Sequence, residues 1–150
     1  MNIFEAPSAW EIEDLKSTDD WCFKIAESDR NQLRASIKST FEKDRDLFSY
    51  SPNEFDFGSS WENIEKAIAE AHHGKGISIV RGLPREDLSQ EEFRLLSWAI
   101  GLKAGVARPQ GLASQYISAV RDAGTDYRAA NGRGYSSNAE LDFHVDVADL

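Results

Sequence analysis

The chain of 150 residues is long enough for one domain with a substantial core, and 41% hydrophobic with 11% aromatic residues is an ordinary globular composition. Its formal net charge of −9 argues against a nucleic-acid partner, which needs a face rich in Lys and Arg, and against a surface for anionic lipid. No run of about eighteen apolar residues occurs, so we expect no membrane span.

The single cysteine, Cys22, cannot form an internal disulfide. The fold therefore does not depend on oxidation, and we expect a reducing, cytoplasmic location. Residues 1–7 have neither the basic start nor the apolar run of a secretory signal. The Cys22 thiol is expected to be a small buried group rather than a nucleophile. These properties do not exclude a homo-oligomer.

The first part of the chain predicts two helices with a strand between them. Residues 8–15 have Ser8 in the N-cap position and Glu11 three residues later, which is the pattern of a capping box. Residues 21–25 alternate apolar and other side chains, as a half-buried strand does. A longer helix is expected from residue 28 or 29 to about residue 47. Its apolar face is formed by Leu33, Ile37, Phe41 and Phe48.

Residues 49–60 are rich in turn formers and predict a loop whose aromatic side chains pack back onto the body. A helix over residues 61–72 follows, and Gly74 or Gly76 is expected to end it. Its buried stripe is predicted to contain Ile64, Ala67, Ile68 and Ala71.

Residues 76–84 predict a short buried strand, because a β-branched run is closed there by Gly and Pro. Ser89 and Glu92 form a second capping box at the start of a helix that Gly101 is expected to end. A loop, a strand and a long ordered loop are then expected over residues 105–111, 115–120 and 122–137.

The last ten residues, 141–150, nearly alternate apolar and polar side chains and predict a strand that carries His144 and Asp146. Residues i and i+2 of a strand project to the same face, whereas a helix would turn them roughly 200° apart. An imidazole and a carboxylate on one face could bind one metal ion, and a second His would complete the facial triad of non-haem Fe(II) oxygenases. A surface strand with ordinary polar residues remains the alternative. By contrast, His72 and His73 are adjacent in a helix and are expected to form its solvated end.

Taken together, these segments resemble the taurine dioxygenase and clavaminate synthase-like family of Fe(II)- and 2-oxoglutarate-dependent oxygenases. The resemblance is clearest over residues 76–150. It rests on segment 76–84, the Ser-capped helix that ends in Ile100-Gly101, the loop 108–110, segment 116–121 and the Phe-His-x-Asp strand within 140–146.

The resemblance implies an α+β fold with a double-stranded β-helix (jelly-roll) core and flanking N-terminal helices. Residues 1–75 would form a helical lead-in, and residues 76–150 would begin the core and contain the metal strand. The remaining strands of such a core would lie beyond residue 150. We therefore expect a single domain that is the N-terminal portion of a longer enzyme, with an incomplete core.

His144 and Asp146 match the first two iron ligands of the family, and they are the catalytic and metal-binding residues that the resemblance implies. The family's distal His, and the Arg that binds 2-oxoglutarate, would lie beyond Leu150. The implied reaction hydroxylates or desaturates a small molecule, such as an amino acid or a natural-product intermediate, and converts 2-oxoglutarate and O₂ to succinate and CO₂. The carboxylate at Asp146 argues against halogenation.

Substrate contacts are expected next to the metal strand and in the preceding loop, from Gln110, Ser137 and Asn138. Each of these residues also has a plain role as a turn former. Two alternatives to the oxygenase are a truncated or non-catalytic jelly-roll domain and a jelly-roll metalloprotein of another class, such as a cupin-like isomerase or a zinc enzyme.

Overall fold

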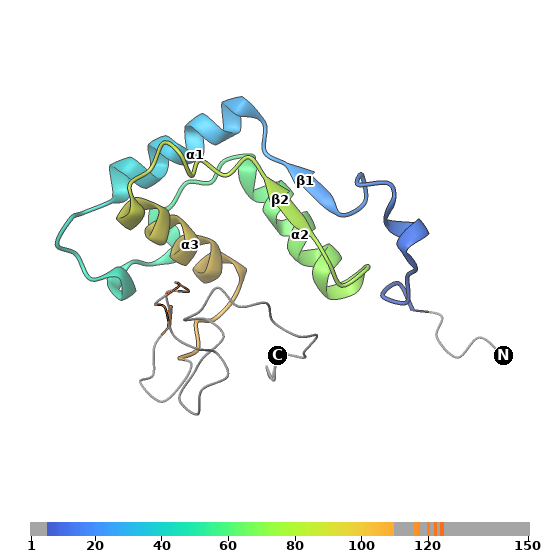
Figure 1. Cartoon of the computed structure of the whole chain (residues 1–150). Coiled ribbons are helices and arrows are strands. Elements are labelled where there is room, and N and C mark those ends of the chain that lie inside the picture. Colours follow the sequence, from blue (N-terminus) through green and yellow to red (C-terminus); the bar gives the residue numbers. More distant parts are fainter. Residues whose placement is uncertain (1–5, 110–115, 118–119, 121, 123, 125–150) are drawn as a thin grey trace. The chain divides into compact units, whose positions relative to one another are not determined.

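The computed structural model describes residues 6–109 together with residues 116, 117, 120, 122 and 124. The chain divides into two compact units, Met1–Ala107 and Arg108–Leu150. All helices and strands among the described residues belong to the first unit (Figure 1). A jelly-roll core and a single domain stay predictions, because they depend largely on residues outside this part of the chain.

Two short strands, β1 (Cys22–Lys24) and β2 (Ile79–Arg81), pair in parallel. The register places Phe23 opposite Val80. The ladder continues at both ends, where the Ile79 amide donates to the Trp21 carbonyl at 2.8 Å and the Ile25 amide donates to the Arg81 carbonyl at 2.9 Å. Both strands were expected from the sequence and are confirmed, although each is shorter than its predicted segment. The prediction that the strand within residues 76–84 is buried was wrong, because Ile79 is 42% exposed and Val80 is half-buried.

Helix α1 (Glu27–Thr40) buries Leu33 and Ile37 completely, as their spacing predicts. The helix ends about seven residues before the predicted residue 47, so the predicted end was wrong. Phe41 has an extended backbone, and the amide of Glu42 donates to the Tyr50 hydroxyl at 2.9 Å instead of continuing the helix.

The segment between α1 and α2 contains two 3-10 helices, η2 (Leu47–Ser49) and η3 (Pro52–Glu54). Its aromatic side chains Tyr50, Phe55 and Phe57 are 5%, 6% and 3% exposed. The prediction that the aromatic residues of this loop pack back onto the body is confirmed for these three side chains.

Helix α2 (Ser60–His73) ends at Gly74, as predicted, and packs against both strands (Figure 1). Ile64 and Ala67 are buried, but Ile68 is half-buried and Ala71 is exposed. The stripe therefore continues onto an open apolar surface. A cavity of about 300 Å³ there is lined mainly by Ile64, Ala67, Ile68, Ala71, Val80 and Leu83.

Helix α3 (Gln90–Ala104) begins with the capping box that the sequence predicts: the Glu92 amide donates to Ser89 Oγ at 3.1 Å, and the Ser89 amide donates to Glu92 Oε2 at 2.7 Å. The expected stop at Gly101 was wrong. One glycine costs a helix only about 1 kcal/mol, and the good helix formers Leu-Lys-Ala follow it. Leu95 and Leu96 are 1% and 0% exposed, and α3 packs against α1, so the core lies between these two helices.

Two further expectations need correction. The first helical segment is a 3-10 helix, η1 (Ile12–Leu15), and its capping box joins Glu11 to Asp14 rather than beginning at Ser8. A backbone turn between Ala6 and Ala9 occupies the place of the expected first helical turn. In the second unit, the described residues 116, 117 and 120 are not in a strand.

Candidate functional site

The residues predicted from the sequence to carry the chemistry all lie outside the described part of the chain. These are the metal ligands His144 and Asp146 and the substrate contacts Gln110, Ser137 and Asn138. Their arrangement stays a prediction.

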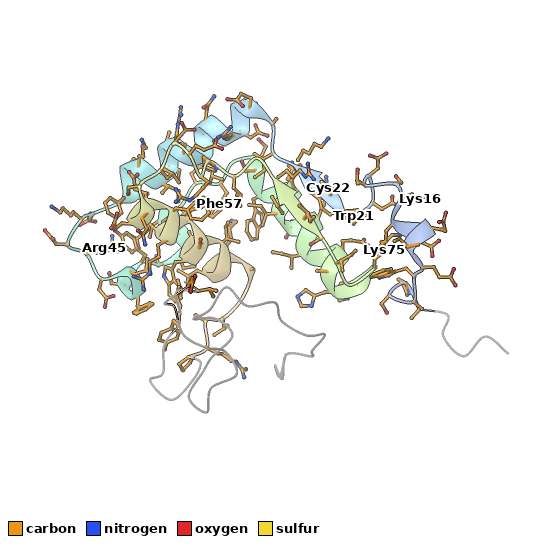
Figure 2. All side chains as sticks on the ribbon, viewed as in Figure 1. Lys16, Trp21, Cys22, Arg45, Phe57 and Lys75 are labelled. Atoms are coloured by element: carbon orange, nitrogen blue, oxygen red, sulfur yellow. The ribbon has the colours of Figure 1, made fainter. Side chains whose placement is uncertain are left out.

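Within the described residues, no three His, Cys, Asp or Glu side chains are grouped so that they could bind a metal ion. His72 and His73 are exposed in the last turn of α2, with ring centroids 6.0 Å apart. Their predicted place at a solvated helix end is confirmed. Cys22 is half-buried in β1, rather than fully buried as expected, and Figure 2 labels it beside Trp21.

The described structure does show what holds the end of α3, where the loop toward Gln110 begins. The Lys103 ammonium lies 4.8 Å from the centre of the Trp61 ring and 5.8 Å from that of Phe57. These two rings meet edge to face at 5.5 Å. Cation–π contacts of this kind are worth about 0.5–1 kcal/mol at exposed sites, and they attach the last turn of α3 to α2.

A second feature is a pocket of about 260 Å³ between the segment that follows α1 and the first turns of α3. We call it the loop–α3 pocket. Its apolar lining consists of Phe41, Leu47, Phe48, Tyr50 and Leu95. Its charged lining consists of Lys43, Arg45, Asp46, Glu91 and Arg94.

Arg45, labelled in Figure 2, organises one wall of this pocket. Its guanidinium forms ion pairs with Glu54 at 2.7 Å and with Glu42 at 3.0 Å, and it stacks 3.9 Å from the centre of the Tyr50 ring. A further hydrogen bond joins Arg45 Nε to Ser49 Oγ at 3.1 Å. The wall is thus fixed by several directed contacts.

The same contacts shift the ionisation of two groups. The hydrogen bond to Glu54 is the main cause that raises the pKa of Arg45. The reciprocal hydrogen bond from Arg45 lowers the pKa of Glu54, and a hydrogen bond from the Ser51 amide lowers it further. Both groups therefore stay charged at neutral pH.

The sequence does not predict this pocket, because the charged run Glu-Lys-Asp-Arg-Asp over residues 42–46 falls within the helix expected up to about residue 47. The signal that could have located it is Asp46 two residues before Phe48, because an aspartate in that position caps a new turn. Its carboxylate accepts the Phe48 amide at 3.1 Å.

No family model matches this chain, and a distant relative is found among known proteins. FR-33289 synthase of Streptomyces rubellomurinus is 22% identical over 144 residues, which is 95% of this chain. Over nearly all its length, the chain is distantly similar to an enzyme. It spans only 42% of the length of that synthase, so the activity of a whole protein is a matter for proposal.

The helices in the described part of the chain are too short or too polar to cross a membrane.

Proposed function

We propose that this chain is the N-terminal part of an Fe(II)- and 2-oxoglutarate-dependent oxygenase. The complete enzyme would hydroxylate or desaturate a small molecule and convert 2-oxoglutarate and O₂ to succinate and CO₂. The observation that carries the proposal is the Phe143-His144-Val145-Asp146 sequence in a segment with strand alternation.

The donor chemistry of these residues suits iron. A neutral imidazole and a carboxylate are two of the three protein ligands of the 2-His-1-carboxylate triad. The described residues offer no competing group of three metal ligands. When bound, iron with 2-oxoglutarate would supply the oxidising power needed to remove hydrogen from an unactivated C–H bond.

The chain's own residues would hold the metal and orient the substrate. His144 would bind through one ring nitrogen, and Asp146 would contribute charge that partly neutralises the cation. The amides of Gln110 and Asn138 and the hydroxyl of Ser137 could form hydrogen bonds with a polar substrate.

The distant similarity to FR-33289 synthase supports an enzyme rather than a purely structural domain, because the match runs along 95% of this chain. More than half of the synthase lies outside the match. The proposal places the distal His and the 2-oxoglutarate-binding Arg in a part of the enzyme that corresponds to the unmatched length of the synthase. An amino acid or natural-product intermediate is the proposed substrate class.

The test is an anaerobic titration with Fe(II) and 2-oxoglutarate of a polypeptide that continues past Leu150 to the length of the synthase. The expected result is a weak visible absorption band from charge transfer between iron and the bound 2-oxo acid. His144→Ala and Asp146→Ala should abolish the band, whereas His73→Ala, which changes an exposed imidazole on α2, should retain it.

Loss of the band in the His73 variant together with the others would point to a general defect rather than to the proposed ligands. Absence of the band from the wild-type protein would favour a non-catalytic domain. Tight binding of zinc with no response to 2-oxoglutarate would favour a metalloprotein of another class.

A further inference from the structure

The edge of β2 that faces away from β1 is open to a further strand. Ile79 and Arg81 form the hydrogen bonds with β1. Alternate residues of a strand direct their backbone groups to opposite edges, so the amide and carbonyl of Val80 point away from β1. Neither group has a hydrogen-bond partner among the described residues. At the outer edge of β1, by contrast, the Cys22 amide already donates to the Thr18 carbonyl at 2.8 Å.

The apolar cavity of about 300 Å³ on α2 lies at this strand, and we call it the β2 groove. Ile64 and Ala67 of α2 form its buried part, each 3% exposed. Val80 and Leu83 line it and are half-buried, and Ile100 of α3 lines it as well. A cavity of about 150 Å³ can hold benzene, so the β2 groove has room for about two apolar side chains.

The sheet itself is smaller and less covered than parallel sheets usually are. It consists of two strands of three residues each. Helix α2 packs against both strands (Figure 1), but Ile79 of β2 is 42% exposed. Parallel sheets are almost always covered on both faces, and strands this short are stable only with further strands or helices around them. The pair is therefore expected to belong to a larger sheet.

We propose that a further β-strand pairs with the open edge of β2 and fills the β2 groove, and that this strand belongs to the same polypeptide, outside residues 1–150. A strand places residues i and i+2 on one face roughly 7 Å apart, so two of its apolar side chains would reach the groove along the three residues of β2. The inference rests on the proposed function in one respect, because the proposed function makes the chain part of a longer enzyme.

The length of the relative and the shape of the groove favour the same polypeptide over a second copy of the chain. More than half of FR-33289 synthase lies outside the match, so that protein has polypeptide that could supply such a strand. A tethered strand also pairs at a higher effective concentration than a separate molecule. A second copy could pair its own β2 with this edge, but its Val80 already lines its own groove. It would bring a second hollow and no side chains to fill the first.

Amide hydrogen exchange, measured residue by residue by NMR, tests the pairing. It compares the 150-residue chain with the polypeptide of the length of the synthase. The Val80 amide should exchange at least about tenfold more slowly in the longer polypeptide, because the added strand would accept its hydrogen bond. The Ile79 amide donates to the Trp21 carbonyl at 2.8 Å without the added strand, so it is the internal reference in both proteins.

Two alanines of α2 test the filling of the groove. Ala71 is exposed and lines the β2 groove, whereas Ala69 is exposed and does not line it. In the longer polypeptide, Ala71→Glu should lower the urea midpoint by about 0.5 M or more, because the carboxylate would be buried without a partner. Ala69→Glu is the matched control and should change the midpoint much less, since both carboxylates lie near the same end of the helix dipole. In the 150-residue chain the two variants should have similar midpoints.

Equal exchange of the Val80 amide in the two proteins would overturn the proposal, and so would equal midpoints of the two alanine variants in the longer polypeptide. Sedimentation equilibrium of the 150-residue chain should show a monomer. A dimer that Ala71→Glu dissociates would overturn the proposal in favour of a second copy as the occupant.

These measurements need neither iron nor 2-oxoglutarate, so they separate the two proposals. Protection of Val80 in a longer polypeptide that gives no visible band would support the added strand and count against the oxygenase. A band without protection of Val80 would do the reverse.

Discussion

The core between α1 and α3 gives the sharpest test of this structure, because two isoleucines of the chain lie in opposite environments. Ile37 of α1 is 0% exposed, whereas Ile12 of η1 is 78% exposed. The same change, Ile→Ala, removes three carbon groups at each position. Only the buried position loses hydrophobic burial and packing.

At about 0.8 kcal/mol for each buried carbon group, Ile37→Ala loses about 2.4 kcal/mol of transfer free energy. The cavity left behind raises the expected loss in unfolding free energy to about 3–4 kcal/mol. Ile12→Ala should cost less than about 0.5 kcal/mol. For a protein with a urea m-value of about 2 kcal/mol/M, the Ile37 variant should unfold at a midpoint about 1.5–2 M lower.

The assay is urea unfolding followed by far-ultraviolet circular dichroism, with the slope of each transition checked for two-state behaviour. Equal midpoints for the two variants, or a loss below about 1 kcal/mol for Ile37→Ala, would refute the packing of α1 against α3 described above.

Other expectations concern caps, glycines and charge, and the same urea assay measures them. Ser89→Ala removes the acceptor of the Glu92 amide and should cost about 1 kcal/mol. Gly82→Ala should cost at least about 1 kcal/mol, because φ is +93° and a Cβ would lie 2.8 Å from the Ile25 carbonyl oxygen. Gly101→Ala, with nothing within 4 Å, should instead stabilise α3 by about 0.5–1 kcal/mol. The lowered pKa of Glu54 stabilises the fold above the carboxyl's ordinary pKa, and this contribution is lost as the pH falls through the lowered value. Glu54→Gln should therefore lower the midpoint at pH 7 and approach wild-type stability in acid; an equal deficit at both pH values would contradict the assignment.

The local signals in the sequence predicted most of the helices. The spacing of Leu33 and Ile37 located the buried face of α1, and the Ser89–Glu92 pair located the start of α3. These features depend on residues within one or two helical turns of each other. The local sequence is therefore enough to predict the cap hydrogen bonds and the buried face of a helix.

The errors arose where a contact from outside the segment decided the outcome. The charged residues 42–46 are compatible with a helix, and only the Tyr50 hydroxyl and the ion pairs of Arg45 show why the chain turns away. The loop–α3 pocket follows from that turn and could not be predicted without it. The metal strand lies outside the described residues, so its prediction still depends on the sequence pattern alone.

The parallel register of β1 and β2 also constrains how the chain can fold. Phe23 and Val80 are more than fifty residues apart in sequence, and α1 and α2 lie between them. Closing so long a connection costs conformational entropy before the hydrogen bonds of the short ladder can form and offset it. The sheet should therefore form late in folding. During synthesis, β1 is made well before β2, and its ladder groups remain available to other chains until β2 has been made and has paired with it.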